Sequence, residues 1–255
     1  MLATTIGASP NKYARVAGIA YLIIILAGLL GEMFVRNTLV VPGDAAATAQ
    51  RIAAAPQLWR AGIAGDLLMH VLDVLVMLML YTLLRPVSKK LALMALLFNV
   101  VQTAVLALNK LNLLVPLFLL SKSAYLGPLE PAQREALAYV FIQAHGYGFG
   151  IGLIFFGFTC LLEGYLIRRS GYLPRLLGGM MQAAGVCYIA NSLLLILAPE
   201  LANSLFPFIM LPPFLGESAF AAWLVIRGVD VHQWQEAKRA RRAKQRAATA
   251  TYSTV

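Results

Sequence analysis

The chain has 255 residues, of which 60% are hydrophobic and only 13% are charged, and its mean hydropathy is +0.75. Soluble domains are about 45–50% apolar and about 25% charged. Long charge-free apolar runs recur along the whole sequence, which excludes a disordered chain, a coiled coil, a disulfide scaffold and a large water-facing domain. The composition therefore predicts a polytopic membrane protein.

Six apolar stretches are each long enough for the ~20 helical residues that cross about 30 Å of hydrocarbon. None of them alternates apolar and polar residues, as the strands of a membrane barrel do. We therefore predict an all-α fold, a polytopic integral membrane helical bundle with six transmembrane helices. The predicted spans are residues 16–35, 61–84, 91–120, 137–163, 176–198 and 206–227.

The distribution of basic residues predicts the orientation. The N-terminus, the second and fourth loops and the tail hold 15 of the 21 Lys and Arg residues, whereas the other loops hold five and Lys110 lies inside a span. By the positive-inside rule, this indicates a multi-pass protein of the cell inner membrane with both termini in the cytoplasm. We expect a six-helix transmembrane domain at residues 1–229 and a basic cytoplasmic tail at residues 230–255.

Two local patterns predict helix boundaries, one in a loop between spans and one inside the last span. In the longest outer loop, at residues 37–59, Asp44 can cap a short Ala-rich helix that Pro56 ends, and Trp59 marks the membrane interface. This loop is either a lid over an outward-facing pocket or a plain interfacial connector. In the last span, three prolines at 207, 212 and 213 predict a kink or a restart of the helix near Pro212.

Ionisable and polar residues inside the spans define the candidate site. A charged side chain near the bilayer centre costs about 2.5–3.5 kcal/mol on insertion scales, so such residues are functional candidates by default. Asp66, His70 and Asp73 follow at i, i+4 and i+7 and form one stripe on a helix. The other candidates for holding a ligand or an ion are Asn99, Gln102, Lys110, His145, Asn191 and Glu217.

Counting residues from the outer ends of the spans places several of these groups at one depth, about 12–18 Å into the membrane. The groups at this level are His70, Asp73, Lys110, His145 and Glu217. We expect Lys110 to pair with Glu217 or, failing that, with Asp73. The remaining negative charge requires a proton, a charged histidine, water or a bound cation. The alternative is a structural ion-pair network that ties the bundle together.

The fourth span contains four glycines in HGYGFGIGL, at positions 146, 148, 150 and 152. Their i, i+4 pairs allow close contact between helices. The spacing is not that of a dinucleotide-binding loop, and no strand precedes it. We therefore expect close helix packing at this point.

Three functional classes fit these residues. The first is a membrane protein that binds or translocates a small ligand or ion in a buried polar pocket. The second is an intramembrane metal-dependent hydrolase, with a divalent metal held by His70, Asp73, His145 and Glu217, or a variant that carries haem b on the two histidines. The third is a non-catalytic accessory or assembly protein. No HExxH motif and no Ser/His pair is present, which weighs against an enzyme.

The tail carries a run of basic residues that predicts a helix against anionic lipid headgroups on the cytoplasmic surface. We expect no nucleic acid partner, because the tail lacks the aromatic interleaving that stacks bases. Since six helices are few for a monomeric transporter, a homo-oligomer is a further expectation. The proposed lipid-binding residues are Lys238, Arg239, Arg241, Arg242, Lys244 and Arg246.

Several segments together resemble the bacterial domain of unknown function family 4386. They are RVAGIAYLIIILAGLLGEMFV, VVPGDAAATAQRI, LYTLLRPV, FNVVQTAVLALN, HGYGFGIGL and GESAFAAWLVIRGV, and the similarity covers about residues 13–229. The VPGDAAAT segment, the Asn99 and Gln102 pair, the histidine before the glycines and the segment from Glu217 to Gly228 resemble recurring features of that family. The resemblance implies a six-helix inner-membrane protein. The family's activity is unassigned, so the resemblance adds no catalytic residues.

Overall fold

The computed structural model describes residues 9–121, 123 and 126–252, with side chains described up to residue 243. Every regular element in this part of the chain is a helix. Six helical segments within it are long and apolar enough to cross a membrane, which confirms the predicted six-helix membrane fold.

The spans are built from ten helical stretches in the described residues. They are α2 (Pro10–Gly31), η1 (Glu32–Arg36) and α3 (Asn37–Leu39) in the first span, α5 (Pro56–Leu84) in the second, α6 (Lys89–Asn109) and α7 (Leu111–Leu119) in the third, α8 (Pro131–Ser170) in the fourth, α9 (Arg175–Leu197) in the fifth, and α10 (Pro199–Ile209) with α11 (Leu211–Ile226) in the sixth. The short helix α4 (Ala45–Ala54) joins the first two spans, and α12 (Val231–Tyr252) follows the last.

The predicted breaks are present. The Asp44 side chain accepts a hydrogen bond from the Ala47 amide at 2.8 Å and caps α4, while Pro56 begins α5. The last span breaks at Met210, and Pro212 and Pro213 occupy the first turn of α11, where a missing amide hydrogen is tolerated. The predictions for the outer loop helix and for the proline restart are therefore confirmed.

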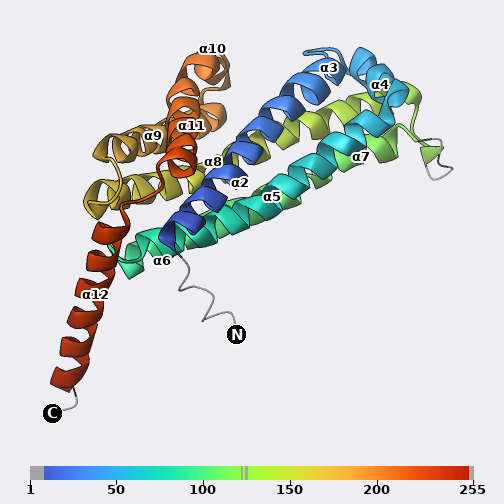
Figure 1. Cartoon of the computed structure of the whole chain (residues 1–255). Coiled ribbons are helices and arrows are strands. Elements are labelled where there is room, and N and C mark those ends of the chain that lie inside the picture. The colour runs from blue at the N-terminus through green and yellow to red at the C-terminus, as the bar shows by residue number, and fades with distance from the viewer. Residues whose placement is uncertain (1–8, 122, 124–125, 253–255) are drawn as a thin grey trace.

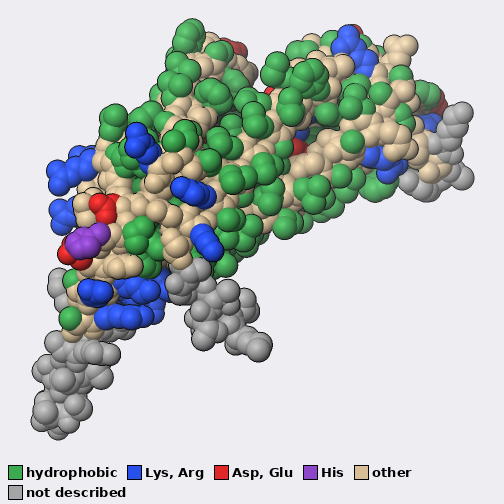
Figure 2. Space-filling view, viewed as in Figure 1, with side chains coloured by type: hydrophobic (Ala, Val, Ile, Leu, Met, Phe, Trp, Pro, Cys, Tyr) green, Lys and Arg blue, Asp and Glu red, His purple; other side chains and the backbone are tan. Residues whose placement is uncertain are grey.

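The six spans close into a ring. Helix α2 contacts α5 and α11, α5 contacts α6, α6 contacts α8, α8 contacts α9, and α9 contacts α11. In Figure 1, α2 lies between α5 and α11, and α9, α10 and α11 gather at one side of the molecule. Side chains on the outside of this ring are largely apolar, as Figure 2 shows, which suits contact with lipid.

Both ends of the described transmembrane part lie at the same end of the bundle. The Val229 amide donates to Asn11 Oδ1 at 2.8 Å, and the Leu83 carbonyl accepts from Tyr172 at 2.7 Å and Trp234 at 3.0 Å. An even number of spans requires this arrangement. We call this the inner end, and the opposite end, near α4, the outer end; that the inner end faces the cytoplasm stays a prediction.

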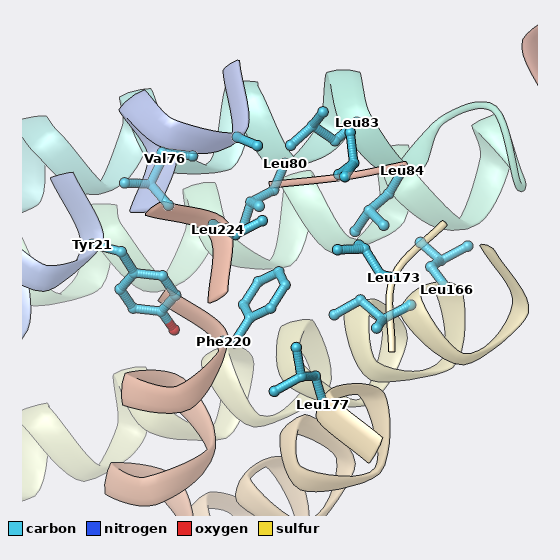
Figure 3. Close-up of a cluster of buried hydrophobic side chains, with 14 of the residues drawn as sticks. Tyr21, Val76, Leu80, Leu83, Leu84, Leu166, Leu173, Leu177, Phe220 and Leu224 are labelled. Carbon is cyan, nitrogen blue, oxygen red and sulfur yellow. The ribbon is translucent and has the colours of Figure 1, made fainter. Parts of the chain in front are cut away.

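A cluster of apolar side chains fills the ring toward the inner end. Figure 3 shows Phe220 and Leu224 of α11 among residues of α5, α8 and α9. Both side chains are fully buried, at 0% exposure. Inside a membrane such side chains stabilise helix contacts through close van der Waals packing, so this cluster packs the helices together at the inner end.

Glycines allow α8 and α9 to approach closely. A Cβ atom on Gly157 would lie 2.8 Å from the Gly185 carbonyl oxygen, and one on Gly164 would lie 2.5 Å from the Gly178 carbonyl oxygen. The glycine run predicted for close packing is partly confirmed. Added Cβ atoms on three of its members, Gly148, Gly150 and Gly152, would collide with neighbouring side chains, whereas Gly146 faces open space.

Candidate functional site

Five charged or ionisable residues form an outer ion-pair network, which joins four segments near the outer end. Asp66 Oδ2 lies 2.7 Å from Lys110 Nζ and 2.9 Å from Arg36 Nη1. Arg36 Nε donates to Glu32 at 2.5 Å. Lys110 Nζ lies 3.2 Å from His145 Nε2, which accepts the hydrogen bond because an ammonium group only donates.

The charges of this network balance, with Arg36 and Lys110 facing Glu32 and Asp66. Arg36 lies in η1, a π-helical turn, and Lys110 lies between α6 and α7. Both positions are irregularities in otherwise continuous spans. π-Helical turns commonly mark functional sites, and here the π-helical turn places Arg36 beside Asp66, as the junction of α6 and α7 places Lys110.

His70 lies one turn inward of Asp66 on the same face of α5. The side chain is 8% exposed, and its Nε2 atom is buried without a hydrogen-bond partner in the described part of the chain. Asp73 follows three residues later on that face. His70 therefore stands between the outer ion-pair network and the next polar group.

Asp73 lies among neutral polar side chains of α6. Its carboxyl group accepts from the Thr103 hydroxyl at 2.7 Å and from Asn99 Nδ2 at 3.2 Å. Asn99 Nδ2 also donates to Gln102 Oε1 at 3.0 Å. Asn99 is fully buried, and its Oδ1 atom has no partner among the residues that the structure describes. The group is rich in oxygen atoms that could accept a further hydrogen bond.

Glu217 is held by two tyrosines from the helices on either side of α11. Tyr21 of α2 donates to Oε2 at 2.8 Å, and Tyr188 of α9 donates to Oε1. Tyr188 also packs against Phe156, with ring centroids 5.4 Å apart. Glu217 itself is 7% exposed and lies in the second turn of α11.

Glu163 on α8 is the least satisfied of the buried carboxyl groups. It is 3% exposed and lies close enough to Asp73 and Glu217 to interact with them electrostatically. No hydrogen bond or ion pair to its carboxyl group occurs within the described residues. We call Asp73, Glu163 and Glu217 the interior carboxyl set.

The interior carboxyl set has no cationic partner in the described part of the chain. Its hydrogen-bond donors are hydroxyl groups and an amide, and Lys110 and Arg36 pair with Asp66. An uncompensated carboxylate buried in a membrane costs several kcal/mol. Protons or a bound cation must therefore neutralise these groups.

The prediction that Lys110 and Glu217 share one depth is wrong. At 1.5 Å per residue, Lys110 lies ~31 Å along its span from the inner end, whereas Asp73 and Glu217 lie only ~14–16 Å from the inner ends of theirs. The outer ends are not level, because α8 begins at Pro131 and α10 is a separate helix. Lys110 consequently pairs with Asp66.

The four predicted metal ligands do not meet. His70 and His145 lie beside Lys110, Asp73 lies against α6, and Glu217 lies between two tyrosines. In the described residues, no three His, Cys, Asp or Glu side chains are placed to hold one metal ion. These four residues therefore do not form one metal site in the structure, and the haem b alternative stays a prediction.

One further predicted residue, Asn191, is buried on α9 at 6% exposure. Its Oδ1 atom has no hydrogen-bond partner within the described part. It lies one helical turn outward from Tyr188, on the same side of α9. Asn191 therefore belongs near the Glu217 group, although no direct bond joins them.

The sequence interpretation missed several residues of these groups. Glu163 stands at the last position of one predicted span and Arg36 just outside another, so neither is among the predicted site residues. Tyr21, Thr103 and Tyr188 carry no charge and gave no signal in a search for ionisable groups. A test for hydroxyl groups on the buried face of each span would have found them.

A groove of about 660 Å³ lies elsewhere, between α4, the end of α7 and the start of α8. Its polar lining includes Asp44, Gln50, Arg134 and Glu135. The interior carboxyl set does not contribute to it. Trp59, expected at the interface, is buried and donates to the Leu113 carbonyl at 2.7 Å.

The predicted lipid-binding residues lie on α12, which extends from the inner end (Figure 1). Trp234 is buried at the start of this helix, and Lys238 Nζ lies 4.9 Å from the centre of its ring. Arg239, Arg241 and Arg242 follow on the described part of the helix. The side chains of Lys244 and Arg246 lie outside the described residues.

Comparison with known proteins gives a family but no activity. The model of a domain of unknown function (DUF4386) matches residues 16–228. An uncharacterized protein of the archaeon Archaeoglobus fulgidus is 33% identical over 168 residues, which cover 65% of this chain and 83% of the relative. No solved structure matches the chain. The chain therefore belongs to the family of the domain of unknown function DUF4386.

Proposed function

We propose that this membrane protein binds and translocates a small ion, the proton, through the interior carboxyl set. The observation that carries the proposal is a set of three carboxyl groups, two of them buried and that of Asp73 half-buried, on three helices of one ring, with no cationic partner among the described residues. Asp73 is contributed by α5, Glu163 by α8 and Glu217 by α11.

The chemistry around these groups suits protons. Carboxyl, hydroxyl and amide groups donate and accept hydrogen bonds, and together they support chains along which a proton moves. Neutralisation of a buried carboxylate by a proton requires no space, whereas a larger ion requires a cavity and several ligands.

The polar groups also extend along much of the length of the helix bundle. The stripe Asp66, His70 and Asp73 runs inward along α5. From Asp73 the carboxyl groups continue to Glu163, which lies only ~10 Å from the inner end of α8. The groups thus extend from the outer ion-pair network toward the inner end.

Proton flux into vesicles tests the proposal. The purified protein is reconstituted into vesicles that contain a pH-sensitive dye, and valinomycin with a potassium gradient makes the inside negative. We expect internal acidification faster than in protein-free vesicles, and we expect Asp73→Asn to reduce the rate to that of protein-free vesicles.

Thr82→Val is the matched control. Thr82 lies on the same helix as Asp73 and is 8% exposed, but its hydroxyl donates only to the Leu78 carbonyl of its own helix. This variant should keep the native rate. If native vesicles acidify no faster than protein-free ones while the protein remains folded, the proposal fails, and an accessory or assembly role takes its place.

A further inference from the structure

We infer that His70 is the relay residue that passes protons between the outer ion-pair network and the interior carboxyl set. This inference rests on the proposed function and assigns a role to one residue within it. The argument depends on the position of His70, on its unpartnered nitrogen atom and on the charges around it.

His70 occupies the only ionisable position between Asp66 and Asp73 on the described face of α5. Residues three and four apart on a helix have Cβ atoms about 5–6 Å apart, so His70 neighbours both carboxyl groups. Without His70, the distance along α5 from Asp66 to Asp73 is ~10 Å, too long for a direct proton transfer.

The Nε2 atom of His70 is available to accept a proton. It is buried and has no hydrogen-bond partner in the described part of the chain, although the buried polar atoms of a protein are almost always paired. A buried imidazole that served only to tie helices together would use this nitrogen atom in a hydrogen bond. The unpaired atom therefore points to a partner that is present only during function.

The charged and titratable groups around His70 come from every segment packed at this level. Asp66 lies on its own helix, Lys110 lies at the junction of α6 and α7, and His145 lies on α8. Arg36 of η1 completes the set through its bond to Asp66. Because these charges are paired with one another, His70 is the group left free to change its protonation.

The transfer conserves protons and charge. Neutral His70 accepts one proton at Nε2 from the outer side and becomes an imidazolium ion. Asp73 first releases its own proton toward the inner end and becomes a carboxylate. The imidazolium ion then releases the proton of Nδ1 to this carboxylate, which becomes a neutral carboxyl group again. The imidazole returns to its first tautomer before the next transfer, as a histidine proton shuttle does.

The experiment uses the full-length protein in the dye-loaded vesicles described above. In His70→Gln, the side chain keeps hydrogen-bonding groups but cannot carry a proton, and we expect the rate to fall about a hundredfold. In His70→Ala, added imidazole should restore part of the lost rate. The rate that imidazole causes in protein-free vesicles is subtracted, and Thr82→Val is measured with and without imidazole as the control.

The outcomes of this experiment distinguish a proton-relay role of His70 from a packing role. A folded His70→Gln protein that keeps the native rate overturns the relay and leaves the proposed function standing. A folded His70→Ala protein that stays inactive with imidazole also overturns it, since a packing role predicts loss without rescue. Native protein that fails to acidify vesicles overturns the proposed function itself, before the variants are considered.

Discussion

The ammonium group of Lys110 and the carboxylate of Asp66 lie 2.7 Å apart and join α5 to the point where α6 gives way to α7. Both side chains are nearly inaccessible, at 4% and 2% exposure. Asp66 has a second partner in Arg36, which in turn has Glu32. Lys110 has no other anionic partner within the described residues. Asp66 thus has two cationic partners, whereas Lys110 has one anionic partner. Loss of Asp66 and loss of Lys110 should therefore change the stability of the protein by different amounts.

We predict that Asp66→Asn destabilises the protein more than Lys110→Met. Loss of Asp66 leaves Lys110 as an unpaired buried cation, which costs about 3–5 kcal/mol, whereas loss of Lys110 leaves Asp66 paired with Arg36. The double variant should be less destabilised than the sum of the two. Unfolding of the purified protein in mixed micelles measures the free energies, and strictly additive effects would show that the pair is not coupled.

A second prediction concerns the contact between α8 and α9. Gly157→Ala places a Cβ atom 2.8 Å from the Gly185 carbonyl oxygen, and overpacking of this kind costs about 1–3 kcal/mol. Gly179→Ala on α9 is the control, because its Cβ atom meets nothing within 4 Å. The control should be neutral or stabilising by about 0.5–1 kcal/mol. Equal melting temperatures for the two variants would contradict the packing of these helices.

A third prediction concerns the basic tail. Replacement of Lys238, Arg239, Arg241 and Arg242 by Gln should leave membrane insertion intact but weaken binding to anionic vesicles, by about 1 kcal/mol for each basic residue near the surface. A soluble peptide of residues 231–252 provides the simplest assay, with neutral vesicles as the control. Equal binding of the native peptide to neutral and anionic vesicles would exclude the lipid role.

The fourth prediction is the orientation. A reporter that is active only in the cytoplasm should be active when fused after residue 252, and one that is active only outside should be inactive there. A fusion in the loop between α4 and α5 should give the opposite pair of results. If the results are exchanged, the inner end faces outward and the direction assigned to the proton path is reversed.

The helices could be predicted from the sequence because each depends on local patterns. Apolar runs of sufficient length predicted the six spans. Asp44 predicted the start of α4, and Pro212 predicted the break before α11. These features depend on hydrogen bonds and hydrophobicity within a few residues of one another. No knowledge of neighbouring helices is needed to predict them.

The partners within the site could be predicted only in part. The stripe on α5 was recognisable from its spacing, and Asn99 and Gln102 do lie beside Asp73. The partner of Lys110 depended on the level of each helix in the membrane, and that level is set by packing between helices rather than by distance from a loop. Sequence spacing alone could not supply this quantity.

The infrared spectrum of the purified protein tests the central claim most directly, namely that protons neutralise the interior carboxyl set. We predict a carbonyl band of buried, protonated carboxyl groups that shifts in D₂O, and that is lost from a folded variant with Asp73→Asn, Glu163→Gln and Glu217→Gln. Thr82→Val should retain the band. A native protein without this band, or a triple variant that keeps it unchanged, would contradict the claim that these three residues hold exchangeable protons inside the ring.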